Sequence, residues 1–272
     1  EYSDPHHFVL FPGPATRNYT AAIYTPGFTG YTEGMSERKP PITVVMPVLN
    51  ETCRVKNAVD YIFSLPAPAP VEVIVVDGDL EGTSLQALGP GPAIGMTAPA
   101  GRALQMNAGA KKAGGDALLF LHADTRLPRQ AFFQVQKALS AGHVGGAFDL
   151  AFDSRRASLK LVAAMARVRS RLTRVPFGDQ AQFFQRNYFF EIGGYAPVPL
   201  MEDIEIMRRI KKRGDRIRII RDRVMTSARR YDEEGVARRV AGNWILQARY
   251  MLGADPEKLA LGYGKHEGRD NA

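Results

Sequence analysis

The sequence predicts an α/β fold with a mainly parallel central sheet flanked by helices. From residue 42 onward, short apolar runs rich in β-branched residues alternate with segments whose apolar residues recur at helical spacing. This alternation is typical of βαβ units, in which each crossover helix covers one face of the sheet. Polar clusters also follow three of the apolar runs, as expected where parallel strands end at one ligand-binding edge.

The first half of the chain carries the regular part of this pattern. Apolar runs bounded by turn residues predict strands at 42–48, 71–76, 93–97 and 117–121. Apolar residues at helical spacing predict helices at 55–63, 101–113 and 132–139. The order of these segments predicts parallel strands joined by crossover helices.

The second half is less regular but predicts elements of both kinds. Strands are expected at 146–152, 181–185 and 217–220. Helices are expected at 159–172, where the helix is basic and amphipathic, and at 201–213 and 236–252. In the helix at 201–213, Ile204, Met207 and Ile210 are expected to face inward.

Composition divides the chain into three parts. Residues 1–40 alternate proline and glycine without a helical or strand period, which predicts an N-terminal extension. Residues 41–235 are expected to form the main domain, and residues 236–272 a C-terminal helix and tail that pack on it. The apolar residues of that helix fit either a membrane-facing strip or packing on the domain, and packing is the expected arrangement. They are Trp244, Ile245, Leu246, Tyr250 and Met251.

Charge and cysteine content narrow the classes of function. The chain has 272 residues and a formal net charge of +8, which favours an anionic partner. Its single cysteine, Cys53, excludes an internal disulfide and a cysteine-built zinc site, and it suits a cytoplasmic location. Thirteen Lys or Arg residues lie between 208 and 239, which predicts a solvated face or, as the alternative, peripheral contact with the inner membrane surface. Aromatic residues are not interleaved with them, so no nucleic-acid partner is expected.

Three polar clusters follow the strands predicted at 42–48, 71–76 and 117–121. They are Asn50-Glu51, Asp77-Gly78-Asp79 and His122-Ala123-Asp124. Parallel strands would bring these distant acids into one cleft. Each cluster alone also fits ordinary turn chemistry, and Asp124 fits equally a metal ligand or the cap of a helix that begins near Pro128. The three clusters together favour a binding site.

Seven motifs follow one another in order along residues 42–262. They are VVMPVLNE (44–51), VIVVDGD (73–79), GRALQMNAGA (101–110), LFLHADTRLP (119–128), FGDQAQFF (177–184), GGY (193–195) and PLMEDIEIMRRIKKRG (199–214). This set resembles the family 2 glycosyltransferases of the GT-A fold, and most closely the small bacterial subgroup described as radical-SAM/selenodomain-associated glycosyltransferases. The resemblance implies a GT-A type nucleotide-diphospho-sugar transferase fold. It also implies an inverting reaction, a nucleotide-sugar donor with UDP as default, and Mg²⁺ or Mn²⁺ as cofactor.

The resemblance implies donor-binding roles for residues in these motifs. Pro47 and Glu51 would line the nucleotide pocket, and Asp77 would accept a hydrogen bond from the donor base. Arg102 opens a predicted helix, where a cation and free backbone N–H groups both suit a diphosphate.

The family's Asp-X-Asp metal motif corresponds to His122-Ala123-Asp124. Asp124, its last carboxylate, would be the metal ligand, as Mg²⁺ and Mn²⁺ prefer oxygen donors. His122 replaces the first acid, which normally meets the ribose. Arg230 resembles, weakly, an arginine that closes over the diphosphate in processive relatives, and is expected to bind phosphate.

Inversion requires a base that takes the acceptor proton on the side of the sugar opposite the leaving group. Glu202 and Asp203, at the start of the helix predicted at 201–213, match the family's catalytic acid pair, and Asp203 is the expected base. The local alternative is that both are first-turn acids that complement a helix dipole. Asp179 is expected near the acceptor and is the second candidate for the base. The acceptor itself is open, with lipid-linked and small molecules both fitting.

Two other classes of function fit parts of the sequence. A sugar nucleotidyltransferase would carry a glycine-rich phosphate loop after the first strand, and VMPVLNE contains no glycine. A basic membrane- or nucleic-acid-binding protein without catalysis would leave the three strand-end clusters without a role. A P-loop and a dinucleotide fingerprint are both absent. The sequence therefore predicts a glycosyltransferase of the hexosyltransferase type.

Overall fold

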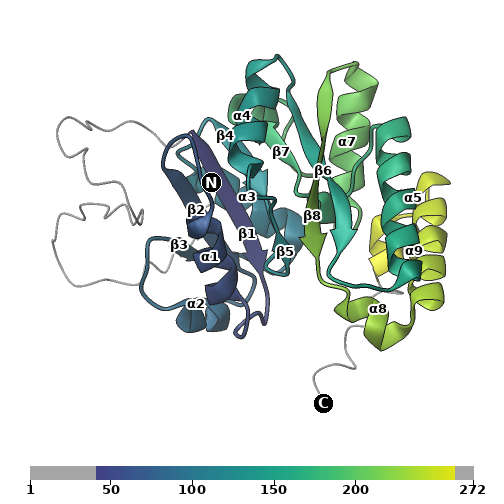
Figure 1. Ribbon diagram of the computed structural model, residues 1–272, viewed down its shortest axis with the longest axis horizontal. Coiled ribbons are helices and arrows are strands. Elements are labelled where there is room, and N and C mark those ends of the chain that lie inside the picture. Colours follow the sequence, from purple (N-terminus) through teal and green to yellow (C-terminus); the bar gives the residue numbers. More distant parts are fainter. Residues whose placement is uncertain (1–40, 261–272) are drawn as a thin grey trace, which may run out of the picture. The chain divides into compact units, whose positions relative to one another are not determined.

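The computed structural model describes residues 41–260, which lie in one compact unit that begins at Lys39. The expected N-terminal extension, residues 1–40, lies outside the described residues, as do residues 261–272 of the tail. Within the described part, one eight-stranded sheet has helices packed on both of its faces (Figure 1).

Most strands of this sheet run in the same direction. The strands are β1 (Ile42–Val48), β2 (Val71–Asp77), β3 (Ile94–Thr97), β4 (Ala117–Phe120), β5 (Thr125–Arg126), β6 (Gly145–Phe152), β7 (Phe183–Gln185) and β8 (Ile217–Thr226). Their order across the sheet is β3-β2-β1-β4-β7-β6-β8-β5. Only β7 and β5 run against their neighbours, while the other strands of this sheet share one direction. The predicted mainly parallel sheet is confirmed.

Helices cover the sheet in two layers. The first layer is α1 (Val55–Ser64), α2 (Thr83–Leu88) and α4 (Ala131–Ser140), with α5 (Ala157–Thr173) beside β6. The second layer is α3 (Arg102–Lys112), α6 (Arg186–Glu191) and α7 (Glu202–Arg213). A short 3-10 helix, η1 (Gly178–Gln180), precedes β7, while α8 (Arg229–Glu234) and α9 (Val236–Met251) follow β8. The longer predicted helices are all present, with ends that shift by a few residues.

The central strand shows why the helices form two layers. Val44 and Met46 of β1 point into the core under α1 and α4, whereas Val45 points into the core under α3. The period of two sends alternate side chains to opposite faces, so the buried strand must be apolar on both. At Gly109 of α3, a Cβ atom would lie 2.5 Å from Val45 Cγ1, so only glycine permits this close packing.

One predicted strand was too short, and the structure excludes one of the two alternatives for Asp124. The strand expected at 217–220 continues to Thr226, because β8 pairs with β6 through a register shift between Phe148 and Asp149. Its middle residues are charged and exposed, which conceals the strand in the sequence. Asp124 does not cap the helix after it, since α4 begins at Ala131 with Gln130 at its N-cap.

The helix α9 packs on the unit through only part of its apolar surface. Leu246 and Tyr250 pack against a small core formed by Leu200, Met201 and Ile204. Trp244, Ile245 and Met251 are instead 56–69% exposed, so the expectation that they pack on the domain was wrong. The partly buried residues of α9 lie at other positions of the helix.

The basic run at 208–239 forms ion pairs within the molecule. The pairs are Arg209 with Glu205, Arg213 with Glu191 and Asp215, Arg229 with Glu233, and Arg239 with Glu234. These partners neutralise part of the positive charge that the sequence gathers there. Within residues 41–260, the helices fall short of the length and hydropathy needed to cross a bilayer.

Candidate active site

The carboxyl ends of β1, β2 and β4 lie side by side, because these strands are parallel neighbours in the sheet. The three polar clusters predicted from the sequence therefore emerge at one edge, as expected. A small pocket lies at this edge. Its lining residues come from strand ends, from α3, from the starts of η1 and α7, and from the loop between α6 and α7: Pro47, Met106, Phe120, Leu121, His122, Gly178, Tyr195, Glu202 and Asp203.

Asp203 lies in the first turn of α7 and is held by two backbone donors. Its Oδ2 atom accepts a hydrogen bond from the N–H of Gly178 at 2.7 Å, and its Oδ1 accepts from the N–H of Ile204 at 2.8 Å. A Cβ atom at Gly178 would lie 3.4 Å from Asp203 Oδ2 and 3.5 Å from His122 Nε2. Gly178 therefore leaves open the space between the imidazole and the carboxylate.

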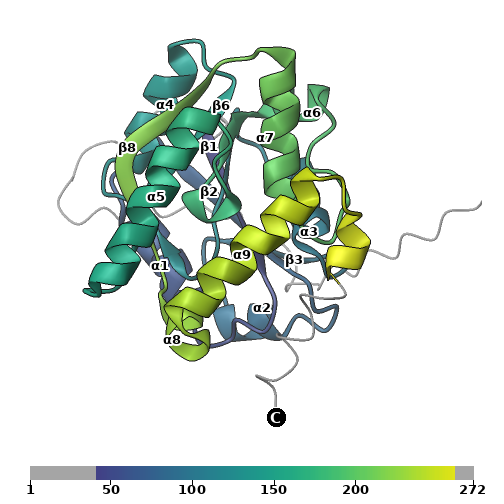
Figure 2. The ribbon, with the colours of Figure 1, turned by 90° about the vertical axis from the view of Figure 1, so that its right-hand side faces the viewer.

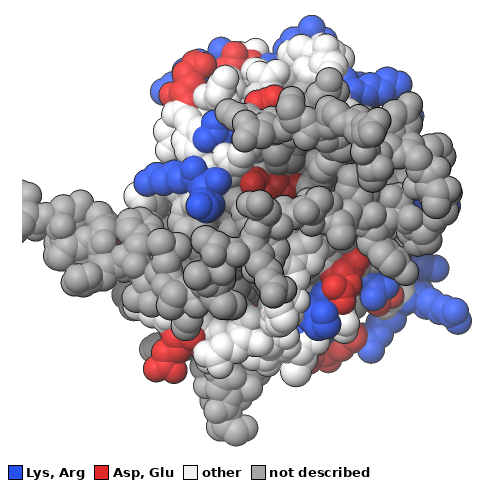
Figure 3. Space-filling model, turned by 90° about the vertical axis from the view of Figure 1, so that its left-hand side faces the viewer, with Lys and Arg blue, Asp and Glu red and all other residues white. Residues whose placement is uncertain are grey.

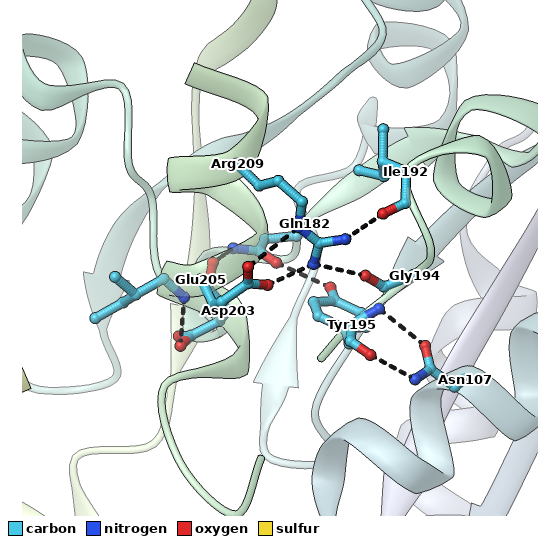
Figure 4. Close-up of polar contacts among 9 residues, drawn as sticks. Asn107, Gln182, Ile192, Gly194, Tyr195, Asp203, Glu205 and Arg209 are labelled. Atoms are coloured by element: carbon cyan, nitrogen blue, oxygen red, sulfur yellow. Dashed lines mark hydrogen bonds and ion pairs between the residues drawn. The ribbon is translucent and has the colours of Figure 1, made fainter. Parts of the chain in front are cut away.

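A hydrogen-bond chain behind the pocket fixes the start of α7 (Figure 4). Gln182 Nε2 donates to the carbonyl of Asp203 at 3.1 Å, and Gln182 Oε1 accepts from the Tyr195 hydroxyl at 2.8 Å. Asn107 of α3 in turn exchanges two hydrogen bonds with the backbone of Tyr195. The motifs that contain Asn107 and Tyr195 thus position Glu202 and Asp203, a role that sequence reasoning did not assign to them.

Glu202 is buried beside Asp203 and pairs with Arg102. The Nε atom of Arg102, the first residue of α3, lies 3.1 Å from Glu202 Oε1. The other oxygen, Oε2, is buried and has no hydrogen-bond partner among residues 41–260. Burial raises the pKa of Glu202 to about 7, against the opposing effect of Arg102 and with a smaller rise from Asp203.

Asp179 in η1 is a second carboxyl with a raised pKa. Burial raises the pKa of Asp179 to about 6, the negative charge of the nearby Asp203 raises it further, and the positive charge of Arg169 opposes the rise. Its Oδ1 atom is buried without a hydrogen-bond partner in the described part of the chain. Arg169 of α5 lies with its guanidinium 3.2 Å from the ring centre of Phe177. The sequence shows Arg169 only as one of several cations on a basic helix, so nothing in it singles out this residue.

His122 and Asp124 lie in a tight turn between β4 and β5. The turn closes with a 3.1 Å hydrogen bond from the N–H of Thr125 to the carbonyl of His122. Burial and the charge of Arg102 lower the pKa of His122 to about 4, with partial opposition from Asp124 and Asp203 and a further lowering by Arg230. His122 is therefore neutral near pH 7, and four of the charged residues predicted for this site act on it.

Asp77 and Glu51 form a separate group at the same edge. Asp77 is fully buried, and its two oxygens accept hydrogen bonds from the N–H groups of Asp79 and Ser84 at 3.1 and 2.8 Å. Ser84 Oγ also accepts from the N–H of Glu51 at 3.2 Å, which ties the end of β1 to α2. Asp77 thus shapes the loop after β2. Pro47, in β1, lies in the lining of the pocket.

Comparison with known families shows to which family of proteins the chain belongs. The profile described as Glycosyl transferase family 2 matches residues 43–199, more than half of the chain. The chain belongs to glycosyltransferase family 2. This membership favours transfer of a glycosyl group over the two alternative classes of function.

Structural comparison of this glycosyltransferase shows its fold. A mannosyltransferase from Pyrobaculum calidifontis, solved in complex with GDP-Man and Mn²⁺, matches with a TM-score of 0.52 and 20% sequence identity. The match covers 69% of this chain and 57% of that chain, so the glycosyltransferase spans little more than half of that structure. Together with the sheet topology, the match confirms the GT-A fold. No curated protein sequence matches the chain significantly.

The side-chain ligands available in this glycosyltransferase fit a metal ion that is held partly by the substrate. Within residues 41–260, no group of three or more His, Cys, Asp or Glu side chains is placed to hold a metal ion. Asp124 lies beside the neutral His122. Among the described residues, its carboxylate accepts one side-chain hydrogen bond, from the Thr125 hydroxyl at 3.3 Å. Mg²⁺ commonly binds one or two carboxylates together with substrate phosphates. The residues present fit that arrangement.

Proposed function

We propose that this glycosyltransferase transfers a sugar from a nucleoside-diphosphate sugar to an acceptor hydroxyl with inversion, with Mg²⁺ or Mn²⁺ as cofactor. The observation that carries the proposal is the pocket where His122 and Asp203 lie on either side of Gly178. Candidate donor-binding residues, Pro47 and His122, and the candidate acids Glu202 and Asp203 come from three separate motifs and line this pocket. If each acid had only a local structural role, these residues would not need to meet in one pocket.

The donor would bind along the carboxyl edge of the sheet. Pro47, Glu51 and Asp77 would form the nucleotide end of the site, with Asp77 acting on the donor base. His122 would contact the ribose. Arg102, at the N-terminus of α3, would hold the diphosphate together with the free N–H groups of that helix, because both favour an anion. Arg230 would add a second cation.

Asp203 would act as the base. Its carboxylate takes the proton of the acceptor hydroxyl as the oxygen attacks the anomeric carbon, while the bond from that carbon to the diphosphate oxygen breaks. The electron pair of the broken bond leaves with the diphosphate, whose charge Arg102 stabilises. Asp179, with its raised pKa, is the second candidate for the base. Glu202, through its ion pair, would orient Arg102.

Asp124 would hold the divalent ion together with oxygens of the donor diphosphate. When bound, the ion supplies positive charge that offsets the charge developing on the leaving group. The mannosyltransferase that shares the fold was solved with Mn²⁺, which supports the choice of ion. The proton of the acceptor hydroxyl would be taken by a carboxylate of this chain and not by the ion.

The finer assignments rest on the motifs. The order of the seven motifs supports membership of the radical-SAM/selenodomain-associated subgroup. UDP is the default nucleotide, and GDP is its first competitor because the structural relative was solved with GDP-Man. A lipid-linked or small-molecule acceptor and a cytoplasmic location, with peripheral contact at the inner membrane face, complete the proposal.

The test is a product analysis with the full chain. Once an acceptor is found, proton NMR of the freshly formed glycoside reports the anomeric configuration. The proposal expects a configuration opposite to that of the donor, and activity that is lost in excess EDTA and restored by Mn²⁺ or Mg²⁺. Retained configuration would refute the role of Asp203, and full activity in EDTA would refute the role of the metal.

A further inference from the structure

Helix α5 carries an exposed apolar stripe. Leu161, Met165, Val168 and Leu172 follow one another at intervals of three and four residues, so they share one side of the helix. They are 42–78% exposed. The opposite side of α5 is buried and includes Leu159 and Ala163, so the stripe is not needed for packing on the sheet.

Helix α9 presents apolar residues on the same side of the molecule. The structure gives α9 no buried residue, and Trp244 and Ile245 are 56% and 60% exposed. The helices α5 and α9 contact each other, and Figure 2 shows both in front of the sheet. We call the exposed residues Leu161, Met165, Val168, Leu172, Trp244 and Ile245 the α5–α9 face. Apolar residues gathered in this way are typical of an interaction site.

The charge of these two helices is entirely positive. The 17 residues of α5 and the 16 residues of α9 contain no Asp or Glu, but four Lys or Arg in α5 and three in α9. Lys160, Arg238 and Arg249 are exposed among them. On the opposite side of the molecule, shown in Figure 3, the coloured residues include both signs of charge. Two of the cations of α5 and α9 have acidic partners, since Arg171 of α5 pairs with Asp149 and Arg239 of α9 pairs with Glu234.

The charge decides what kind of partner fits the face. A second copy of the chain would bring like charges together in a two-fold contact, which opposes association. An anionic surface is attracted by the cations, and an apolar interior accepts the exposed side chains. We propose that the α5–α9 face docks on an anionic lipid bilayer.

The face adjoins the pocket. Helix α5 runs into the segment that carries Phe177 and Gly178, and Leu246 and Tyr250 of α9 pack on Leu200 and Met201, directly before Glu202. Docking would therefore place the mouth of the pocket near the membrane surface. The proposal rests on the peripheral membrane contact included in the proposed function and names the surface that makes it, whereas docking itself requires no catalysis.

The test uses the full chain and sedimentation with vesicles. One set of vesicles contains zwitterionic phosphatidylcholine alone, and the other contains in addition about 30% anionic phosphatidylglycerol. We expect the protein to bind the anionic vesicles at least ~10-fold more tightly, and the binding to weaken as salt is raised. Equal binding to both kinds of vesicle, or binding to neither, would overturn the proposal.

Three double variants test the face itself. Leu161→Gln with Leu172→Gln and Trp244→Gln with Ile245→Gln remove apolar contacts, and Lys160→Glu with Arg238→Glu reverses charge. Each is expected to reduce binding at least ~10-fold, because each removes a substantial part of the buried area or of the attraction. All six residues are exposed, so the melting temperature should stay close to that of the parent chain.

A matched control comes from α4, where Phe133 and Lys137 are also exposed. Phe133→Gln with Lys137→Glu makes the same kinds of change and is expected to leave vesicle binding within ~2-fold. Equal loss in this control would overturn the assignment of the face. A concentration-dependent dimer that the face variants dissociate, without vesicle binding, would also overturn it in favour of self-association. Nucleotide binding by the same variants separates this outcome from failure of the proposed function.

Discussion

The Oδ2 atom of Asp203 accepts a 2.7 Å hydrogen bond from the backbone N–H of Gly178. This bond joins the first turn of α7 to the 3-10 helix that carries Asp179. Since Gly178 has no side chain, His122 and Asp203 line one open space. The predictions below follow from this arrangement.

Asp203→Asn should abolish transfer while donor binding is retained. The amide cannot take the acceptor proton, and a positioned base contributes roughly 10²- to 10⁴-fold to the rate. The measurements are steady-state transfer and calorimetric titration with the nucleoside diphosphate. Glu205→Gln removes a charge from the same helix, outside the pocket lining, and is the matched control. If Asp203→Asn instead abolishes nucleotide binding, Asp203 is a donor ligand and Asp179 becomes the base.

Gly178→Ala should impair transfer without unfolding the protein. The added methyl group would lie 3.4–3.5 Å from the Asp203 carboxylate and from His122 Nε2, where the acceptor hydroxyl must enter. We expect kcat/KM for the acceptor to fall about 10-fold, with nucleotide binding little changed. Gly91→Ala, where a Cβ atom would meet nothing within 4 Å, is the control. Unchanged kinetics for Gly178→Ala would show that the acceptor does not pass this point.

Arg102→Gln should weaken binding of the nucleoside diphosphate but not that of the corresponding nucleoside. A charge-assisted hydrogen bond to phosphate is worth about 1.5–3 kcal/mol, which corresponds to roughly 10-fold or more in Kd. The substitution also leaves the buried Glu202 without the cation that it pairs with. The double variant with Glu202→Gln removes that cost, so an affinity loss that persists in it belongs to the diphosphate contact. Recovery of affinity in the double variant would make Arg102 a structural residue.

Asp179→Asn should stabilise the protein at pH 8 and leave its stability unchanged at pH 3. Burial raises the pKa of Asp179 from 3.8 to about 6, so the folded state holds its proton more tightly than the unfolded state does. The wild-type chain therefore loses stability as pH rises between these two values, and the amide cannot show that loss. We expect a gain of about 1–3 kcal/mol at pH 8, measured by urea unfolding. Asp222→Asn, at an exposed position, is the control and should change the stability at pH 8 by less than about 0.5 kcal/mol.

The sequence was sufficient for the architecture of the first half of the unit. The strand predicted at 42–48 matches β1 residue for residue, because a fully buried parallel strand is a continuous β-branched run. The strand β8 was underestimated, since its exposed residues Arg221, Asp222 and Arg223 conceal it. Trp244 and Ile245 were expected to pack inward, and hydrophobicity alone cannot tell a core-facing strip from a partner-facing one.

The candidate site was predictable where a motif carried it. Strand ends explain why His122 lies at the same edge as Pro47, because the parallel strands β1 and β4 end there side by side. Arg169 could not be found, since its approach to Asp179 depends on how α5 packs beside η1. Gln182 and Tyr195 were also beyond reach, because the bond from Gln182 to Asp203 of α7 and the bond from Tyr195 to Gln182 join separate segments of the chain.

The most direct test of the account is a thermal-shift comparison of the wild-type chain and Asp124→Ala with UDP, GDP, ADP, CDP and dTDP, each with and without Mn²⁺. A ligand that binds only the native state raises the melting temperature by mass action. The account predicts that one nucleotide stabilises the wild-type chain in a Mn²⁺-dependent manner, and that Asp124→Ala loses the Mn²⁺ dependence. The same Mn²⁺-dependent shift in both chains would contradict the assignment of Asp124. A wild-type chain that no nucleotide stabilises would contradict the donor site itself.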